Sequence, residues 1–270
     1  MDRIITGHSY GVLLYSMHLF STNRMLLRSK KKKLLNYNPE LGSMPFHTRL
    51  LGKDRMALFS FVHSLNTNFG TSIFEPVAKA LASTNFQSAL SQQIAGTQIS
   101  SEAFLVIEHI MTGLTTAETN PDKPSETEAI RAVCQSGEMR TVKPTKIDIK
   151  LVAHDETIYL FDLKTAKPNA GGFKEFKRTL LEWVAATLAT NPEANIKTLI
   201  AIPYNPYEPA PYNRWTMRGM LDLPNELKVA AEFWDFLGGE GTYMQLLDIF
   251  ERVGIELRGE IDAYFARYNR

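Results

Sequence analysis

The sequence predicts an α/β protein in which helices flank a mixed central β-sheet, with a helical C-terminal part. The first observation is a pair of strand-like runs, Lys146–Ala153 and Thr157–Lys164, which lie three residues apart and predict a β-hairpin. The second is the long amphipathic segment Phe173–Thr190, which is followed by the short apolar run Lys197–Pro203. A helix of this length can cross over and bring the apolar run into the same sheet as a buried strand.

Three helices are expected before the hairpin, the first because apolar residues recur at helical spacing and the other two because residues that can cap a helix stand at their starts. Their expected bounds are Arg55–Leu65, Thr71 or Ser72 to about Leu81, and Ser100 or Ser101 to about Met111. The segment Asn66–Gly70 predicts a turn between the first two helices. The polar segment Thr115–Ser125, which contains two prolines, predicts a loop.

After the buried strand predicted at Lys197–Pro203, one long loop precedes the helical C-terminal third of the chain. Tyr204–Arg218 is rich in Pro, Tyr and Asn and predicts the loop. The helices expected after it are Asn225–Leu237, Tyr243–Val253 and Ile255–Tyr268, separated by Gly238-Gly239 and by Gly254. The aromatic residues Phe233, Trp234 and Phe236 are expected to pack in the core or in a dimer interface.

The chain is expected to form a single domain over residues 44–270, preceded by a basic extension over residues 1–43. The extension is loosely patterned and closes with turn-forming residues, so we expect it to be poorly ordered. A compact pattern begins near Met44, and Met44 as the true initiator is the alternative interpretation.

The composition is that of an ordinary globular protein, with 44% hydrophobic and 22% charged residues. The single cysteine, Cys134, excludes a disulfide framework and a zinc site built from several cysteines. We therefore expect a reducing compartment, the cytoplasm. No apolar run reaches the roughly 18 residues that predict a membrane-spanning helix, and Tyr10–Phe20 lacks the cleavage site of a signal peptide.

Charge is unevenly distributed, although the net charge is only +1. Residues 1–60 contain ten Lys and Arg against three Asp and Glu, and the run Lys30–Lys33 is the centre of this excess. Such a run is usually a solvated tail or helix face, and non-specific contact with phosphates is the alternative. The overall balance neither supports nor excludes nucleic acid as a partner, because a local basic patch is sufficient.

Three charged residues of the predicted hairpin can converge. Asp162 and Lys164 share a face, because strand residues i and i+2 point the same way. They follow the apolar run Ile158–Phe161, and at the end of a buried strand two charges cost free energy unless they are paired or metal-bound. The hairpin would bring Asp148 beside them. Two carboxylates can hold Mg²⁺, and the ammonium can polarise a water or neutralise a phosphate; a solvated charged end is the alternative.

In this element order, Asp148 on one strand and Asp162-x-Lys164 on the next resemble the PD-(D/E)xK nuclease superfamily. Further stretches are similar to the TdeIII-type family of type II restriction endonucleases, and this resemblance covers roughly residues 45–268. The stretches that carry it are His63–Ala78, Lys146–Lys150, Phe161–Asn169, Asn205–Pro209, Arg214-Trp215 and Glu232–Phe236.

The resemblance implies a restriction-endonuclease-like fold and a Mg²⁺-dependent, homodimeric enzyme with a cognate DNA methyltransferase as its genetic partner. Such an enzyme cuts both strands of double-stranded DNA at a short interrupted palindrome of the GGNCC kind. Asp148 matches the first metal-binding acid, Asp162 the acid of the second strand and Lys164 the lysine. Ile147 stands where the superfamily pattern has a proline, and Pro144 lies further back.

Further residues are expected to complete the site. The backbone carbonyl of Leu163 is a candidate metal ligand beside the two aspartates. Glu75 is a candidate additional acid, and the alternative is that it only favours a helix N-terminus. The candidates for DNA contact are Lys167 and Asn169 at phosphates and Asn213, Arg214 and Arg218 at bases, since Arg pairs bidentately with guanine. A plain surface loop anchored by Trp215 is the alternative for the last three.

The sequence is also compatible with two other functions. One is a structure-selective repair or recombination nuclease of the same fold, and the other is a catalytically silent DNA-binding module. The intact set of Asp148, Asp162 and Lys164 argues against silence. The six histidines show no HxxxH or HNH-like spacing, and the absence of a Walker-type or GxGxxG loop argues against an ATP-driven subunit.

Overall fold

The computed structural model describes residue 38 and residues 44–164, 172–213, 217 and 219–268. The described residues between 82 and 240 form one compact unit, and residues 44–81 with 241–268 form a second. Apart from Asn38, the predicted basic extension lies outside the described residues. The prediction of a single domain over residues 44–270 stays a prediction.

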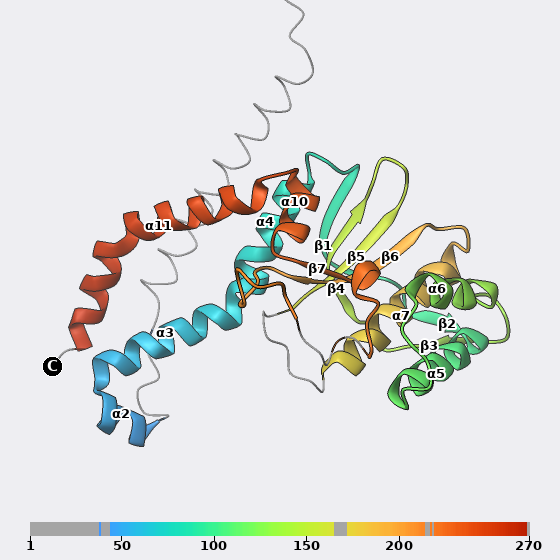
Figure 1. Ribbon diagram of the computed structural model, residues 1–270, viewed down its shortest axis with the longest axis horizontal. Helices are drawn as coiled ribbons and strands as arrows, with labels where there is room; N and C mark the ends of the chain where they lie inside the picture. The colour runs from blue at the N-terminus through green and yellow to red at the C-terminus, as the bar shows by residue number, and fades with distance from the viewer. Residues whose placement is uncertain (1–37, 39–43, 165–171, 214–216, 218, 269–270) are drawn as a thin grey trace, which may run out of the picture. The chain divides into compact units, whose positions relative to one another are not determined.

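A mixed sheet of five strands is the centre of the 82–240 unit, in the order β1-β4-β5-β6-β7 (Figure 1). Its strands are β1 (Ser88–Ile94), β4 (Lys146–Val152), β5 (Ile158–Leu163), β6 (Ile196–Ile202) and β7 (Leu227–Val229). The pairs β1–β4 and β4–β5 are antiparallel, whereas β5–β6 and β6–β7 are parallel. The predicted fold class, the hairpin and the buried strand after it are confirmed.

Burial along the strands follows from their places in the sheet. On β4, Ile147, Ile149 and Leu151 alternate with less buried residues and are fully buried, as expected for a strand with one apolar face. β5 lies between β4 and β6 and is covered on both faces. Leu160 and Phe161 are therefore both buried although they point to opposite sides.

Two helices cover opposite faces of this sheet. The helix α7 (Gly172–Thr190) connects β5 to β6, and the hydroxyl of Thr198 donates to the carbonyl of its residue Leu180 at 3.0 Å. The helix α10 (Ala231–Gly238) packs on the other face, where the rings of Phe233 and Phe161 meet edge to face at 5.4 Å. Phe233 and Trp234 are buried, so the core position predicted for them is confirmed.

Smaller elements complete this unit. They are the two-stranded pair β2 (Gln98–Ser100) and β3 (Met139–Thr141) and the helices α5 (Ser101–Thr115), α6 (Lys123–Ala132) and α9 (Leu223–Glu226). The predicted start of α5 is confirmed: Ser100 is its N-cap, and the Ser100 hydroxyl accepts a hydrogen bond from the Ala103 amide at 3.0 Å.

Two sequence predictions in this unit are wrong. The end of the predicted loop Thr115–Ser125 is helical, because Asp122 caps α6 by accepting the Ser125 amide at 3.0 Å. The predicted helix Asn225–Leu237 is replaced by α9, β7 and α10. Leu227–Val229 pairs with the distant strand β6, and helical periodicity cannot reveal such a pairing.

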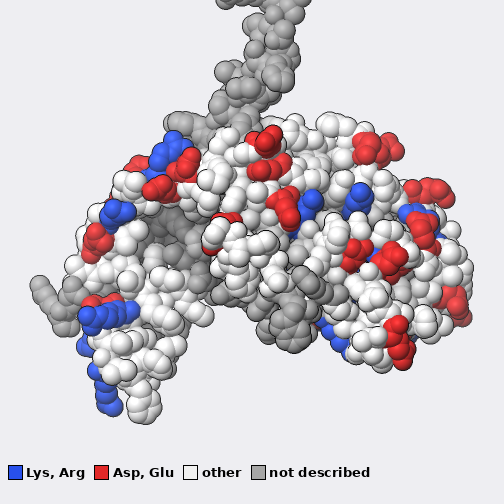
Figure 2. All heavy atoms as spheres, in the orientation of Figure 1, with Lys and Arg blue, Asp and Glu red and all other residues white. Residues whose placement is uncertain are grey.

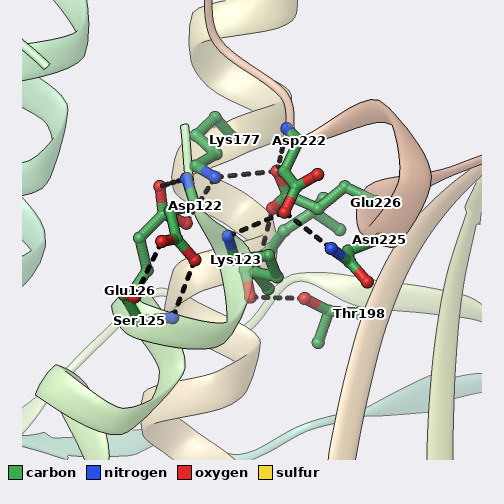
Figure 3. A network of polar contacts seen from close by, with 10 residues as sticks. Asp122, Lys123, Ser125, Glu126, Lys177, Thr198, Asp222, Asn225 and Glu226 are labelled. Carbon is green, nitrogen blue, oxygen red and sulfur yellow. Dashed lines mark hydrogen bonds and ion pairs between the residues drawn. The ribbon is translucent and has the colours of Figure 1, made fainter. Parts of the chain in front are cut away.

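A buried ionic network joins α6, α7 and α9 (Figure 3). The Lys177 ammonium is fully buried and contacts the carboxylates of Glu126 and Glu226, the second at 2.7 Å. Lys123 lies 3.1 Å from the other oxygen of Glu226. Burial lowers the pKa of Lys123, and the charge of Glu226 opposes that shift. Two ammoniums thus balance two carboxylates, and the network holds α7 in place beside the sheet.

The second unit is helical. It consists of α2 (Pro45–Leu51), α3 (Lys53–Phe69), the π-helical segment η1 (Gly70–Phe74), the start of α4 (Glu75–Ala82), α11 (Thr242–Phe265) and the short η2 (Ala266–Tyr268). Phe61 and Tyr264 are buried together, and the ring of Phe61 meets that of Phe265 at 5.4 Å.

Two predicted interruptions in this unit are wrong. The turn expected at Asn66–Gly70 is helical, and η1 joins α3 to α4 by a hydrogen bond from the Glu75 amide to the Gly70 carbonyl. The break expected at Gly254 does not occur, since Gly254 lies inside α11. A glycine weakens a helix by only about 1 kcal/mol, which tertiary packing can offset.

Cys134, the single cysteine of the chain, is a buried free thiol. In the part of the chain that the structure describes, no helix combines the length and apolar character needed to cross a membrane.

Candidate active site

The β4–β5 hairpin brings the first two candidate acids together at its open end. Ile149 pairs with Phe161, and one step further along the two strands stand Asp148 and Asp162. The amide of Leu163 donates a hydrogen bond to Oδ2 of Asp148 at 2.8 Å. The carboxylate of one strand is therefore fixed against the backbone of the other, as the sequence predicted for a hairpin.

Lys164 completes the group. Its backbone amide donates to the carbonyl of Ala201 on β6 at 2.9 Å, which extends the parallel pairing past the end of β5. Its ammonium lies 2.8 Å from Oδ1 of Asp162, so the predicted common face of these two residues is present. The same ammonium lies 4.5 Å from the centre of the Phe176 ring on α7, within the range of a cation–π contact.

Asp162 is in an environment that disfavours its charge. The residue is 8% exposed, and burial raises the pKa of its carboxyl to about 6. The neighbouring Lys164 lowers the pKa, whereas the second carboxylate, Asp148, raises it further. Asp162 is buried and Asp148 is half-buried, and two carboxylates that repel each other in such surroundings are stabilised when a cation binds between them.

The donor atoms suit a hard, oxygen-preferring cation. Asp148 and Asp162 offer carboxylate oxygens, and the carbonyl of Leu163 lies between Asp162 and Lys164 in sequence. Mg²⁺ binds through one or two carboxylates and keeps waters and substrate phosphate as its other ligands. Within residues 44–164, 172–213 and 219–268, no group of three or more His, Cys, Asp or Glu forms a richer site.

Glu75 lies in the helical unit, so its predicted place in the site stays a prediction. It is buried, with 4% of its surface exposed, at the first residue of α4. Because α4 continues from η1, Glu75 does not lie at an open helix N-terminus. The alternative that Glu75 only stabilises the dipole of a helix N-terminus is therefore not supported.

Most of the predicted DNA-contacting residues lie outside the described residues: Lys167, Asn169, Arg214 and Arg218. Trp215, the expected anchor of the alternative surface loop, also lies outside them. Asn213 is described and exposed, at the end of the loop that follows β6. Earlier in this loop, the side-chain amide of Asn205 donates to the Ala210 carbonyl at 2.8 Å and its oxygen accepts the Tyr207 amide at 3.0 Å.

Two contacts to the predicted site residues were missed by the sequence analysis. Phe176, which covers the Lys164 ammonium, was identified only as an apolar residue of a predicted helix. The side chain of Gln92 on β1 donates to Oδ1 of Asp148 at 3.4 Å. Ser88–Ile94 is polar and carries no clear strand pattern, so no local signal pointed to Gln92.

Charged side chains elsewhere on the molecule are mixed in sign. On the face of the 82–240 unit visible in Figure 2, Lys and Arg side chains are interspersed with Asp and Glu. This matches the net charge of +1 for the whole chain. That face therefore does not have the single-sign basic surface expected of a non-specific phosphate-binding face.

The sequence is similar to a known protein family and to several known restriction enzymes. The family described as "Type II restriction endonuclease, HinfI" matches residues 22–254, a range that begins inside the predicted extension. The type II restriction enzyme HgiEI of Herpetosiphon aurantiacus is 26% identical over 221 residues, covering 80% of this chain and 79% of its own length. HgiCII from the same organism is 27% identical over 224 residues, covering 80% of each chain. The type II restriction enzyme MjaII of Methanocaldococcus jannaschii is 25% identical over 254 residues, 84% of this chain and 67% of its own.

Proposed function

The chain belongs to the HinfI family of type II restriction endonucleases, and from this premise we propose that it is a Mg²⁺-dependent enzyme specific for a short interrupted palindrome of the GGNCC kind. A type II restriction enzyme is a site-specific deoxyribonuclease, so DNA is its substrate. The observation that carries the proposal is the convergence of Asp148, Asp162 and Lys164. The proposed GGNCC-like site and the finer TdeIII-type assignment rest on the sequence resemblance alone.

The proposed mechanism gives each residue of this group one task. Asp148, Asp162 and the carbonyl of Leu163 would hold Mg²⁺. The chemistry that bound Mg²⁺ supplies is neutralisation of the charge that develops on the phosphate and a lower pKa for a coordinated water. Lys164, anchored by Asp162 and covered by Phe176, would orient the attacking water or neutralise the phosphate. Glu75 is proposed as a further acid, and Lys167 and Asn169 as contacts to the phosphate.

Digestion of unmethylated plasmid or phage DNA tests the function. We expect discrete fragments with Mg²⁺ and none after EDTA, because the two carboxylates alone cannot stabilise the charge of the transition state. A folded protein that cuts none of several such substrates would refute the proposed Mg²⁺-dependent cleavage. Cleavage that requires junctions or flaps would support a repair nuclease instead.

We further propose a two-fold homodimer, because a palindromic site mirrors the symmetry of the protein that reads it. A dimer that cuts both strands in one encounter converts supercoiled plasmid directly to linear DNA in the same digestion. Sedimentation as a monomer, even on cognate DNA, would contradict the dimer. A cognate DNA methyltransferase is proposed as the genetic partner, and the cytoplasm as the location.

Base reading is proposed for Asn213, Arg214 and Arg218. Arg214→Ala and Arg218→Ala should weaken binding to cognate DNA much more than binding to random DNA, since a lost bidentate contact to guanine costs roughly 1–3 kcal/mol of discrimination. Fluorescence anisotropy with both DNAs at several salt concentrations measures the two effects. An equal loss on both DNAs, with a smaller salt slope, would assign the arginines to phosphates.

A further inference from the structure

Gln92 has an unusual backbone conformation for its place in the sheet. It lies inside β1 with φ of +54°, a region that L residues other than glycine enter only at a cost in free energy. The pairing around it is intact, since Ser91 pairs with Ile149 and Gln93 pairs with Ile147. An inserted residue, the usual cause of such a distortion in a strand, is therefore excluded.

The position of Gln92 in the register suggests a reason for this conformation. It stands opposite Asp148, between the two intact pairs. Its side-chain amide donates to Oδ1 of Asp148 at 3.4 Å, while Oδ2 of the same carboxylate accepts the Leu163 amide at 2.8 Å. The two strands that flank β4 thus each hold one oxygen of Asp148.

We propose that Gln92 is a positioning residue that orients the Asp148 carboxylate for metal binding, and that its strained backbone is retained for this purpose. The inference rests on the proposed function of Asp148 as a metal ligand. A neutral amide suits the task, because it directs the carboxylate without supplying a charge that competes with the metal. Partners of this kind change metal affinity or activity roughly 10- to 100-fold when they are removed.

The substitution Gln92→Gly separates this role from a structural one, because it removes the side chain and relieves the backbone at the same time. The melting temperature should not fall. The Mg²⁺ concentration for half-maximal cleavage should rise, and cleavage at fixed Mg²⁺ should slow, by roughly 10- to 100-fold. In the absence of DNA, calorimetric titration with Mn²⁺ should show a correspondingly weaker affinity.

Glu156→Gly is the matched control. Glu156 is an exposed residue of the β4–β5 turn with φ of +65°, so glycine relieves a similar strain away from the carboxylates. Its variant should keep the wild-type metal dependence. Gln92→Met preserves the approximate length of the side chain but cannot donate to Asp148 and adds no charge beside the carboxylates, so it should lose activity as the glycine variant does.

The outcomes are distinguishable. If the wild type cuts DNA and Gln92→Gly or Gln92→Met cuts with unchanged metal dependence, Gln92 does not position Asp148. If Gln92→Gly melts at a lower temperature than the wild type, the side chain has a structural role and the inference is overturned. If the wild type itself never cuts, or Asp148→Ala cuts normally, the proposed function fails instead.

Discussion

Asp162→Asn should abolish DNA cleavage while leaving the protein folded. The asparagine removes the charge that a metal ion would bind, and loss of one member of a catalytic unit costs on the order of 10⁴-fold or more in rate. The fold should tolerate the change, because burial raises the pKa of Asp162 to about 6 and so already disfavours the charged form. The melting temperature should therefore stay the same or rise. A plasmid digestion time course and a thermal melt measure the two effects.

The same loss of cleavage is expected for Asp148→Ala and Lys164→Ala, with specific DNA binding still measurable in Ca²⁺. Asp155→Ala is the matched control, because Asp155 is a carboxylate of the same hairpin that accepts the Thr157 amide in the turn at 3.0 Å. This variant should cut normally. If Asp162→Asn or Asp162→Ala retains a near-native cleavage rate, the assignment of Asp162 on β5 as a metal-binding acid is wrong, whatever the other variants do.

Glu226→Gln should have the largest effect on stability. Glu226 is fully buried and contacts the ammoniums of both Lys123 and Lys177, so the substitution leaves two buried cations facing the single carboxylate of Glu126. Breaking a buried ion pair by removing one partner costs about 3–5 kcal/mol. Unfolding by urea, followed by far-ultraviolet circular dichroism, gives the change in the free energy of unfolding.

A control variant and a double variant test whether the loss of stability comes from the buried charges. Glu128→Gln removes a carboxylate that is 69% exposed and paired with Arg131, and it should cost only about 0–1 kcal/mol. The double variant Lys177→Met/Glu226→Gln removes one charge of each sign, so it should cost less than the sum of its single variants. A cost for Glu226→Gln similar to that of Glu128→Gln would mean that the network does not hold α7 through its charges.

Local patterns were sufficient for several elements and for the core of the candidate site. The hairpin, α7 and β6 each bury one consistent set of apolar residues, and burial of that kind leaves a periodic trace in the sequence. Asp162 and Lys164 converge because alternate strand residues share a face, and Asp148 joins them because a short turn forces the two strands together. These relations involve residues close in the chain, so the amino-acid order determines them.

The tertiary structure decided what depends on distant partners. β1 and β7 are stable because they pair with β4 and β6, and neither has a strong strand pattern of its own. The same pairing places Gln92 against Asp148 across a separation of 56 residues. The buried network likewise joins Lys177 to glutamates 51 and 49 residues away. The three charged residues of the candidate site could be predicted from one hairpin. The contacts that surround and support them form only when the chain folds, because burial and pairing between remote segments leave no local periodicity in the sequence.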